Sequence, residues 1–371
     1  MPLAGKELGK FRRQLLAWFA RRQRDLPWRR TKDPGRIWLS EIMLQQTRVA
    51  AVIPYYERFV ARFPDVRALA EAPEEEILRH WSGLGYYSRA RNLQRAAREI
   101  VARHAGEFPR DYEAALALPG IGRYTAAAIL SIAYGAPHAV LDGNVARVLA
   151  RLEALRGDLR APRRWQGLQA SADRLLERNR PGDWNQAMME LGATLCTPRA
   201  PDCAACPVAR WCRARRLGLV ETIPEKRRKR APVQVHLAAA VFLDAQGRTL
   251  LLPPPRRAAA PGTPGELSPL FSRMWHFPAV RAGKNARRAL RNHLDKSFGE
   301  AAAAGAEIAA AKHVRQAVTH REITVAPFLV RVEKLPRPRG ARALLLRELH
   351  TLPVSNLTRK IARAAAPARA Q

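Results

Sequence analysis

Cysteine is confined to one short stretch of this 371-residue sequence: all four thiols lie between Cys196 and Cys212. The N-terminal residues contain no apolar run of signal-peptide length followed by a small-residue cleavage site. No stretch approaches the roughly 18 uninterrupted apolar residues of a membrane span. These absences predict a protein of a reducing, cytoplasmic compartment with no membrane partner, where clustered thiols more often bind metal than form disulfides.

Acidic residues are also scarce. The sequence has 32 Asp and Glu against 65 Lys and Arg, a formal net charge of +33, and a sequence pI of about 11.4. So large a positive charge favours a polyanionic partner, most simply nucleic acid. The alternative is compositional, because a GC-rich genome enriches a sequence in arginine and alanine without any binding function.

The four thiols follow the spacing C-x6-C-x2-C-x5-C. Structural zinc usually uses two tight pairs, and only Cys203 and Cys206 form one here. Iron–sulfur clusters also take four thiolates with more varied spacing, so the spacing leaves zinc and iron–sulfur open. Two disulfides are the less favoured reading, because a chain of this length buries a large core without covalent staples.

The hydrophobic pattern predicts two domains joined by a basic linker. Residues 1–220 repeat apolar positions at helical spacing, and residues 221–232 form a proline-bracketed basic linker. Residues 233–371 favour a smaller α+β domain. Its expected elements are strands at 233–243, 248–252, 313–320 and 323–333, a helix at 285–298, and a last helix N-capped by Ser355.

Three segments carry residues suited to chemistry on DNA. In "LPGIGRYTAAAIL", Gly120 and Gly122 form a turn whose backbone amides and following helix N-terminus favour a phosphate. Asp142 precedes another helix, and it is either a simple N-cap or a carboxylate that stabilises positive charge on a sugar. Glu41 lies among apolar residues. It is either a surface glutamate or a carboxyl that stays protonated near neutral pH and acts as an acid.

Together these residues suit the excision of a base. Breaking an N-glycosidic bond passes through an oxocarbenium-like state, in which an acid protonates the leaving base and an ionised carboxylate stabilises the sugar. A phosphate grip would hold the strand while the base is flipped out of the stack. Tyr86, Tyr87, Gln45 and Gln46 are candidates to fill the vacated space, with ordinary packing as their alternative role.

The four-cysteine stretch, the glycine turn and the following aspartate together resemble the helix–hairpin–helix glycosylases of the endonuclease III superfamily. Within it, "WLSEIMLQQTRVA", "GLGYYSRARNL", "LDGNVARVL" and "WNQAMMELGATLC" resemble the adenine DNA glycosylase (MutY) family over nearly all of residues 8 to 220. The resemblance implies an all-α glycosylase domain. It also implies a 4Fe–4S cluster in the loop 196–212, held by Cys196, Cys203, Cys206 and Cys212.

The resemblance also implies roles for individual residues. Glu41 matches the acid that protonates N7 of adenine, and Asp142 matches the carboxylate that stabilises or captures C1′. Tyr124 and Asn144 match residues that support that carboxylate. The residues implied to line the adenine pocket or to surround the lesion are Trp28, Arg29, Gln45, Gln46 and Tyr86.

The C-terminal domain resembles the Nudix-like lesion-recognition domain of the same family, through "MWHFPAV" and "HVRQAVTHREITV". The sequence lacks the glutamate-rich helix of a Nudix hydrolase, so we expect recognition rather than hydrolysis. Family members usually carry Phe-Ser-His in the hairpin that reads 8-oxoguanine. This chain has Val318, Thr319 and His320, which keeps a hydroxyl and an imidazole but loses the aromatic ring.

The sequence therefore predicts a monofunctional, monomeric base-excision glycosylase. Its implied partner is duplex DNA with adenine opposite 8-oxoguanine or guanine, in a bacterial cytoplasm and on the nucleoid. One rival is a bifunctional endonuclease III-like enzyme acting on oxidised pyrimidines, which needs a lysine where this chain has Tyr124. A rival of another class is a non-catalytic DNA-binding protein that uses the cluster as a redox sensor.

Overall fold

The computed structural model describes residues 4–225, 231–254, 267, 270–271, 273–299, 306–318 and 320–366. The chain divides into two compact units, which are described separately. The first comprises Met1–Glu71 and Asn92–Arg228, and the second comprises Ala72–Arg91 and Lys229–Gln371. Within the described ranges, every helix is too short or too polar to cross a membrane.

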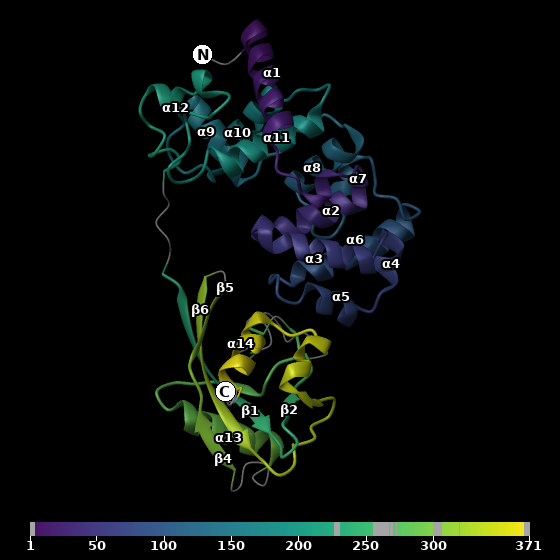
Figure 1. Cartoon of the computed structure of the whole chain (residues 1–371), viewed down its shortest axis with the longest axis vertical. Helices are drawn as coiled ribbons and strands as arrows, with labels where there is room; N and C mark the ends of the chain where they lie inside the picture. The colour runs from purple at the N-terminus through teal and green to yellow at the C-terminus, as the bar shows by residue number, and fades with distance from the viewer. Residues whose placement is uncertain are drawn as a thin grey trace. The chain divides into compact units, whose positions relative to one another are not determined.

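The first unit is built from helices (Figure 1, purple to teal). Its elements are α1 (Gly5–Arg22), η1 (Pro27–Arg29), α2 (Pro34–Leu44), α3 (Val49–Arg62), α4 (Val66–Glu71), most of α6 (Ser88–Arg103), α7 (Tyr112–Ala117), α8 (Arg123–Tyr134), α9 (Gly143–Glu153), α10 (Pro162–Leu175), α11 (Pro181–Thr194), η2 (Ala209–Trp211) and α12 (Arg213–Arg216). The helical character predicted for this part of the sequence is confirmed.

Helix α11 lies at the centre of this unit and contacts α1, α8 and α9. Two glycines allow the close approach. A Cβ on Gly182 would lie 2.6 Å from the Ser131 carbonyl oxygen of α8, and one on Gly192 would lie 2.8 Å from Cβ of Asn144 in α9. Neither distance is tolerated by a real side chain, so both positions require glycine. The consequence is that the C-terminal part of α8 and the N-terminal end of α9 are held against one helix.

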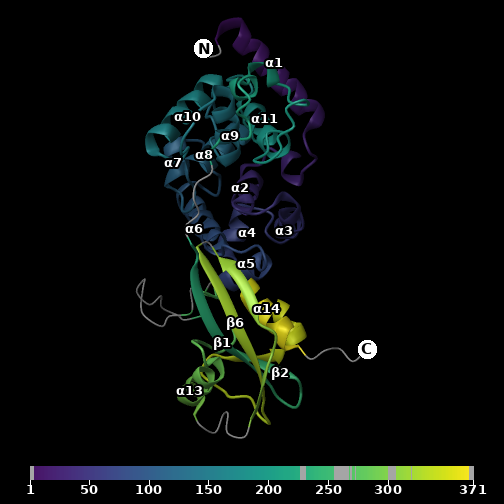
Figure 2. The same cartoon turned by 90° about the vertical axis from the view of Figure 1, so that its left-hand side faces the viewer.

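The second unit contains a mixed five-stranded sheet in the order β3-β1-β6-β4, with β5 paired to β6, and a separate pair β2-β7. Its strands are β1 (Val233–Leu243), β2 (Arg248–Leu251), β3 (Ala279–Arg281), β4 (Glu307–Ala310), β5 (Val314–Val318), β6 (Arg321–Arg331) and β7 (Arg342–Leu345). Strands β1 and β6 run parallel over the register Val233↔Arg321 to Leu243↔Arg331. Figure 2 shows these two long strands side by side.

The helical segments of the second unit are α5 (Glu74–Trp81), α13 (Ala286–Phe298), η4 (Leu346–Thr351) and α14 (Asn356–Ala365). Of these, α13 and α14 contact strands of the mixed sheet. Asn285 caps α13 by accepting from the Arg288 amide, and Ser355 caps α14 by accepting from the Thr358 amide. The helix expected at 285–298, the cap at Ser355 and the paired strands around residue 321 are therefore confirmed.

Candidate active site

A cavity of about 560 Å³ in the helical unit collects most of the candidate residues. It is formed by η1, the end of α2 and the loop after it, the starts of α8 and α9, and one face of α11. The expected residues in its lining are Trp28, Arg29, Glu41, Gln45, Gln46, Tyr124, Asp142 and Asn144. Its lining does not include Gly120, Gly122, Tyr86 or His320.

Glu41 lies in the last turn of α2, and its side chain is buried. Burial raises the pKa of its carboxyl to about 7, and the charge of Asp142 adds to this, while a hydrogen bond from Tyr124 opposes it. The Tyr124 hydroxyl donates to Oε2 of Glu41 at 2.7 Å. Near neutral pH a substantial fraction of Glu41 is therefore protonated, as a general acid requires.

The hydroxyl of Tyr124 has other hydrogen-bond partners than the one that the resemblance implies. The resemblance implies support of Asp142, whereas the structure gives its hydroxyl two partners, Glu41 and the Met189 sulfur at 3.1 Å. Burial raises the pKa of Tyr124 well above its usual value, so the phenol stays neutral and can donate. Its hydroxyl thus donates to the Glu41 carboxyl, whereas the Asp142 carboxyl accepts from Asn144 and Val145.

Asp142 caps α9 and faces the same cavity. Its Oδ1 accepts from the Val145 amide at 2.7 Å, and its Oδ2 accepts from the Asn144 side chain at 3.0 Å. Burial raises the pKa of Asp142. The two hydrogen bonds and the charge of nearby Arg147 oppose that shift, because they favour the ionised form. Both roles considered for Asp142 are thus compatible: it is an N-cap, and it also presents a carboxylate to the cavity.

The segment that leads to Asp142 is anchored by Asn185 of α11. The Asn185 side chain donates to the carbonyl oxygen of His138 at 2.8 Å and accepts from the Val140 amide at 3.2 Å. Arg147, one turn into α9, donates to Oδ1 of Asn144 and to the Cys196 carbonyl oxygen, both at 2.8 Å. The position of the aspartate thus depends on two helices and on the start of the thiol loop.

A buried carboxylate that sequence reasoning missed completes the cavity. Glu190 of α11 accepts from Arg24 at 2.7 Å on each oxygen, and from Arg29 at 2.8 Å. Burial alone would raise its pKa, but the two guanidinium groups outweigh this and lower the pKa to about 2. Glu190 is therefore a permanent anion, unlike Glu41. Its only signal in the sequence is an acid between Met189 and Leu191 in an apolar run.

The remaining cavity walls come from η1 and from the loop after α2. Trp28 is buried, and its ring meets that of Tyr56 edge-on at 5.4 Å. Gln45 and Gln46 follow the last residue of α2, and Gln46 has a left-handed backbone with φ 55. A backbone of this kind is uncommon outside glycine, so the loop holds the two amides in a defined place beside the cavity.

The glycine turn lies between α7 and α8. Gly120 has φ +80, and a Cβ there would meet Cβ of Asn92 at 2.8 Å. Gly122 is the N-cap of α8, has open space around its Cα, and brings no side chain to the first helical amides. The exposed N-terminus of a twelve-residue helix is suited to an anion such as a phosphate.

Two predicted lesion-reading positions lie in the second unit. Tyr86 is exposed and has a left-handed backbone with φ 47. His320 lies at the tip of the β5–β6 hairpin, where its carbonyl oxygen accepts from the Val233 amide. Thr319 lies outside the described residues.

The four cysteines follow α11 in the chain: three of them precede η2, and Cys212 comes directly after it. None forms a disulfide, and each is partly exposed. No group of three or more His, Cys, Asp or Glu side chains in the described ranges is placed to hold a metal ion. Burial and the charges of the other three thiols raise the pKa of Cys206 to about 12, against an opposing backbone hydrogen bond. The chemistry of the donor set, apart from its geometry, suits an iron–sulfur cluster, because four thiols in one loop ionise together only where a cation offsets the repulsion between their thiolates.

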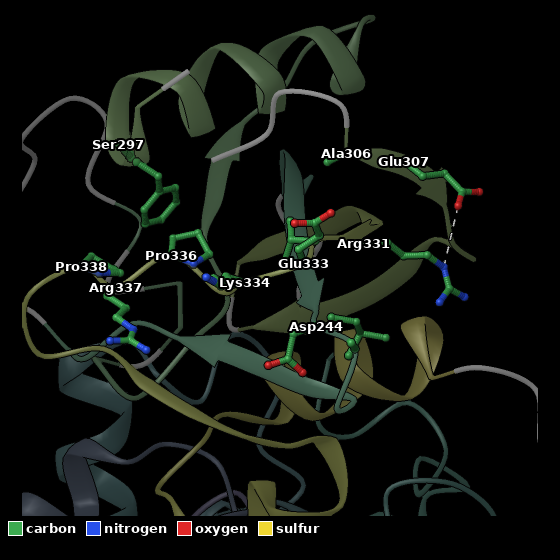
Figure 3. A pocket seen from close by; sticks show the side chains of 14 residues that line it. Asp244, Ser297, Ala306, Glu307, Arg331, Glu333, Lys334, Pro336, Arg337 and Pro338 are labelled. Carbon is green, nitrogen blue, oxygen red and sulfur yellow. Dashed lines mark ion pairs between the residues drawn. The ribbon is translucent and has the colours of Figure 1, made fainter. Parts of the chain in front are cut away.

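A second cavity lies in the sheet unit. Its volume is about 1100 Å³, and its lining includes residues at the ends of β1, β6 and α13. Figure 3 shows the side chains that line it, among them Asp244 and Arg331. Its acids include Asp244, which accepts from Arg248, and Glu307, which pairs with Arg331 at 3.9 Å. The nearby helix α13 carries a single acid, Asp295. It therefore lacks the glutamate-rich character of a metal-binding hydrolase helix.

Comparison with known proteins places these features in context. A family model, the HhH-GPD superfamily of base excision DNA repair proteins, matches residues 39–166. The chain is 49% identical over 218 residues to an adenine DNA glycosylase of Homo sapiens, covering 56% of this chain and 40% of that protein. It is 35% identical over 336 residues to an adenine DNA glycosylase of Arabidopsis thaliana, covering 79% of this chain and 51% of that protein.

The chain thus spans about half the length or less of these two curated relatives. Among solved structures, a trapped endonuclease III–DNA covalent intermediate superposes with a TM-score of 0.50 at 22% identity. That match covers 58% of this chain and 99% of the other. At this identity the likeness concerns the fold, so endonuclease III is related in architecture only.

Proposed function

Because the chain belongs to the adenine DNA glycosylase family of the HhH-GPD superfamily, we propose that it excises adenine from duplex DNA in which adenine lies opposite 8-oxoguanine or guanine. One observation carries the proposal. A buried acid whose pKa is raised to about 7, Glu41, shares a cavity with the hydrogen-bonded carboxylate of Asp142. Two carboxyl groups in such different surroundings suit one acid and one charge-stabilising role.

In the proposed reaction, protonated Glu41 gives its proton to N7 of a flipped adenine. The C1′–N9 bond then breaks, its electron pair leaves with the base, and positive charge develops on the sugar. Ionised Asp142, fixed by Asn144 and the Val145 amide, stabilises that charge until water adds at C1′ and gives up a proton to the Glu41 carboxylate. Tyr124 keeps the Glu41 carboxyl aimed into the cavity.

Arg24, Arg29 and Glu190 provide a fixed polar wall for the base. The Glu190 carboxylate offsets one of the two guanidinium charges, so the cavity gains directional hydrogen-bonding groups and keeps one of the two positive charges. Trp28 adds a flat apolar surface. We infer that this wall and Trp28 receive the extruded adenine, while the N-terminus of α8 at Gly122 and the turn at Gly120 hold a backbone phosphate.

The monofunctional assignment rests on the absence of a suitable amine. A lyase forms an imine at C1′ after the base leaves, and this requires a lysine near the sugar. The described residues that line the cavity include no lysine, and Tyr124 offers only a phenol. We therefore propose that the product is an abasic site in an intact strand.

We propose that Cys196, Cys203, Cys206 and Cys212 bind a 4Fe–4S cluster. Purified protein should be brown and contain about four irons per chain, measured by elemental analysis. Cys203→Ser should lower iron content and weaken DNA binding, because the loop loses the ion that organises it. A colourless, fully active protein with one zinc per chain would refute the cluster.

We propose that the sheet unit is a Nudix-like domain in which Thr319 and His320 read the base opposite adenine, and that Tyr86, Gln45 and Gln46 fill the space around the lesion. We further propose that the protein acts as a monomer on the bacterial nucleoid.

The direct test offers the purified protein duplexes with each of the four bases opposite 8-oxoguanine or guanine. Reactions are run under single turnover and analysed with and without alkali. The proposal expects cleavage only at adenine, and only after alkali. Excision of an oxidised pyrimidine with alkali-independent nicking would favour the bifunctional rival, and binding without excision would favour the non-catalytic one.

A further inference from the structure

The turn that carries Tyr86 belongs to the same compact unit as the C-terminal sheet. It joins α5 to α6 and is unusually constrained, because Gly83, Gly85 and Tyr86 all have positive φ values of 118, 73 and 47. For a bulky residue such as tyrosine this backbone costs about 1–3 kcal/mol, so it persists only where surrounding contacts enforce it. Trp81 and Arg89 donate to the Gly85 carbonyl oxygen from either side of the turn.

The start of α14 supplies the contacts to the first residues of the turn. The Arg359 guanidinium donates to the Ser82 hydroxyl at 2.8 Å, and that hydroxyl donates to the Val354 carbonyl oxygen at 2.7 Å. The Asn356 side chain donates to the Gly83 carbonyl oxygen at 3.1 Å. Ser82 and Val354 are both buried, so these hydrogen bonds are shielded from water and would be costly to lose.

Helix α14 also holds the strand that leads to the hairpin tip. It contacts β1, β5 and β6, and Lys360 donates to the Arg315 carbonyl oxygen of β5 at 2.9 Å. Arg359 and Lys360 are adjacent in one helix, yet one faces the Tyr86 turn and the other faces β5. The helix thus contacts both the turn that carries Tyr86 and strand β5.

We propose that Arg359 and Asn356 are positioning residues that hold Tyr86 in its working geometry, so that the C-terminal unit contributes to the rate of excision as well as to the choice of opposite base. The proposal rests on the proposed function and on the role of Tyr86 beside the lesion. Arg359 acts only through the turn. Its effect should therefore depend on whether residue 86 carries an aromatic ring.

The test is a double-mutant cycle in the full-length protein. Arg359→Ala should slow single-turnover adenine excision about tenfold, the order expected when a shielded hydrogen bond to a charged group is lost. In a Tyr86→Ala background the same change should cost less than about twofold, because the ring it positions is gone. Arg359→Lys should recover part of the rate. Arg363→Ala, an exposed arginine one turn later in α14, is the matched control and should leave the rate unchanged.

Equal losses in both Tyr86 backgrounds, or no loss in either, would overturn the proposal. Where Arg359→Ala fails to fold, Asn356→Ala removes the bond to Gly83 and takes its place in the cycle. A second readout does not need activity: amide hydrogen exchange of the peptide covering residues 82–91 should accelerate in Arg359→Ala and not in Arg363→Ala. Unchanged exchange would refute the contact itself, whereas an inactive wild type with the expected exchange pattern would refute only the proposed function.

Discussion

The two units differ in how far their candidate functional residues are buried. In the helical unit, the carboxyl groups of Glu41, Asp142 and Glu190 are buried or nearly so and line one cavity. In the sheet unit, the proposed recognition residues Tyr86 and His320 are exposed and lie on a turn and a hairpin tip. Burial shifts the pKa of an acid, and exposure leaves a side chain free to meet another molecule. We therefore propose bond cleavage for the first unit and discrimination of the opposite base for the second.

Glu41→Gln tests the proposed role of the helical unit most directly, because it keeps the shape of the side chain and removes its acidic proton. We expect excision to fall by about 10²–10⁴-fold, the usual contribution of a general acid, while DNA binding survives. The loss should be equal opposite 8-oxoguanine and guanine. Single-turnover assays on both duplexes measure this, with the exposed Glu57→Gln on α3 as control. A loss below tenfold would argue against the acid role.

The same substitution should affect stability in the opposite direction. Because the folded-state pKa of Glu41 is about 7 and its ordinary value is 4.5, the folded protein holds a proton that the unfolded chain has released between these pH values. The free energy of unfolding should therefore fall as pH rises from 4.5 to 7, by up to about 3 kcal/mol.

Glutamine does not ionise, so this loss of stability with rising pH does not apply to it. Its side-chain oxygen can still accept the hydrogen bond from Tyr124. Urea unfolding at pH 5 and pH 8 should thus show Glu41→Gln gaining stability over wild type mainly at pH 8. The same difference at both pH values would mean that Glu41 is ordinary in the folded state.

Tyr124→Lys tests the distinction between base excision alone and base excision followed by strand nicking in the same cavity. The ammonium would lie where the phenol now contacts Glu41 and would lower the pKa of that acid, so we expect excision to slow about tenfold. The amine should also form an imine at C1′, giving strand nicking and borohydride trapping that wild type lacks. Tyr124→Phe is the control, since it keeps the ring and supplies no amine. Trappable nicking by wild type would overturn the monofunctional assignment.

The smallest effect is expected at the hairpin. His320→Ala should lower the preference for 8-oxoguanine over guanine about fivefold, equivalent to one hydrogen bond of about 1 kcal/mol, with little change opposite guanine. His313→Ala, also exposed and just before β5, is the matched control. A uniform slowing on both duplexes would place His320 in general DNA binding instead of discrimination.

Much of the fold was predictable because its signals are local. Helical periodicity before residue 220, the strand at Val233–Leu243 and the cap at Ser355 depend on neighbouring residues, and the structure contains each of them. The candidate site was partly predictable for the same reason. A carboxyl among apolar residues and an aspartate before a helix are visible in the sequence, and Glu41 and Asp142 do share a cavity.

The sequence by itself determined which chemical groups are available: two acids in distinct surroundings, a glycine turn and four clustered thiols. Only the tertiary structure decided their partners. Tyr124 donates to Glu41 across 83 residues, Glu190 pairs with Arg24 across 166, and Ser82 bonds Val354 across 272. The physical reason is that local patterns reflect backbone propensity and burial of a face, whereas a hydrogen bond between distant segments depends on how whole helices pack.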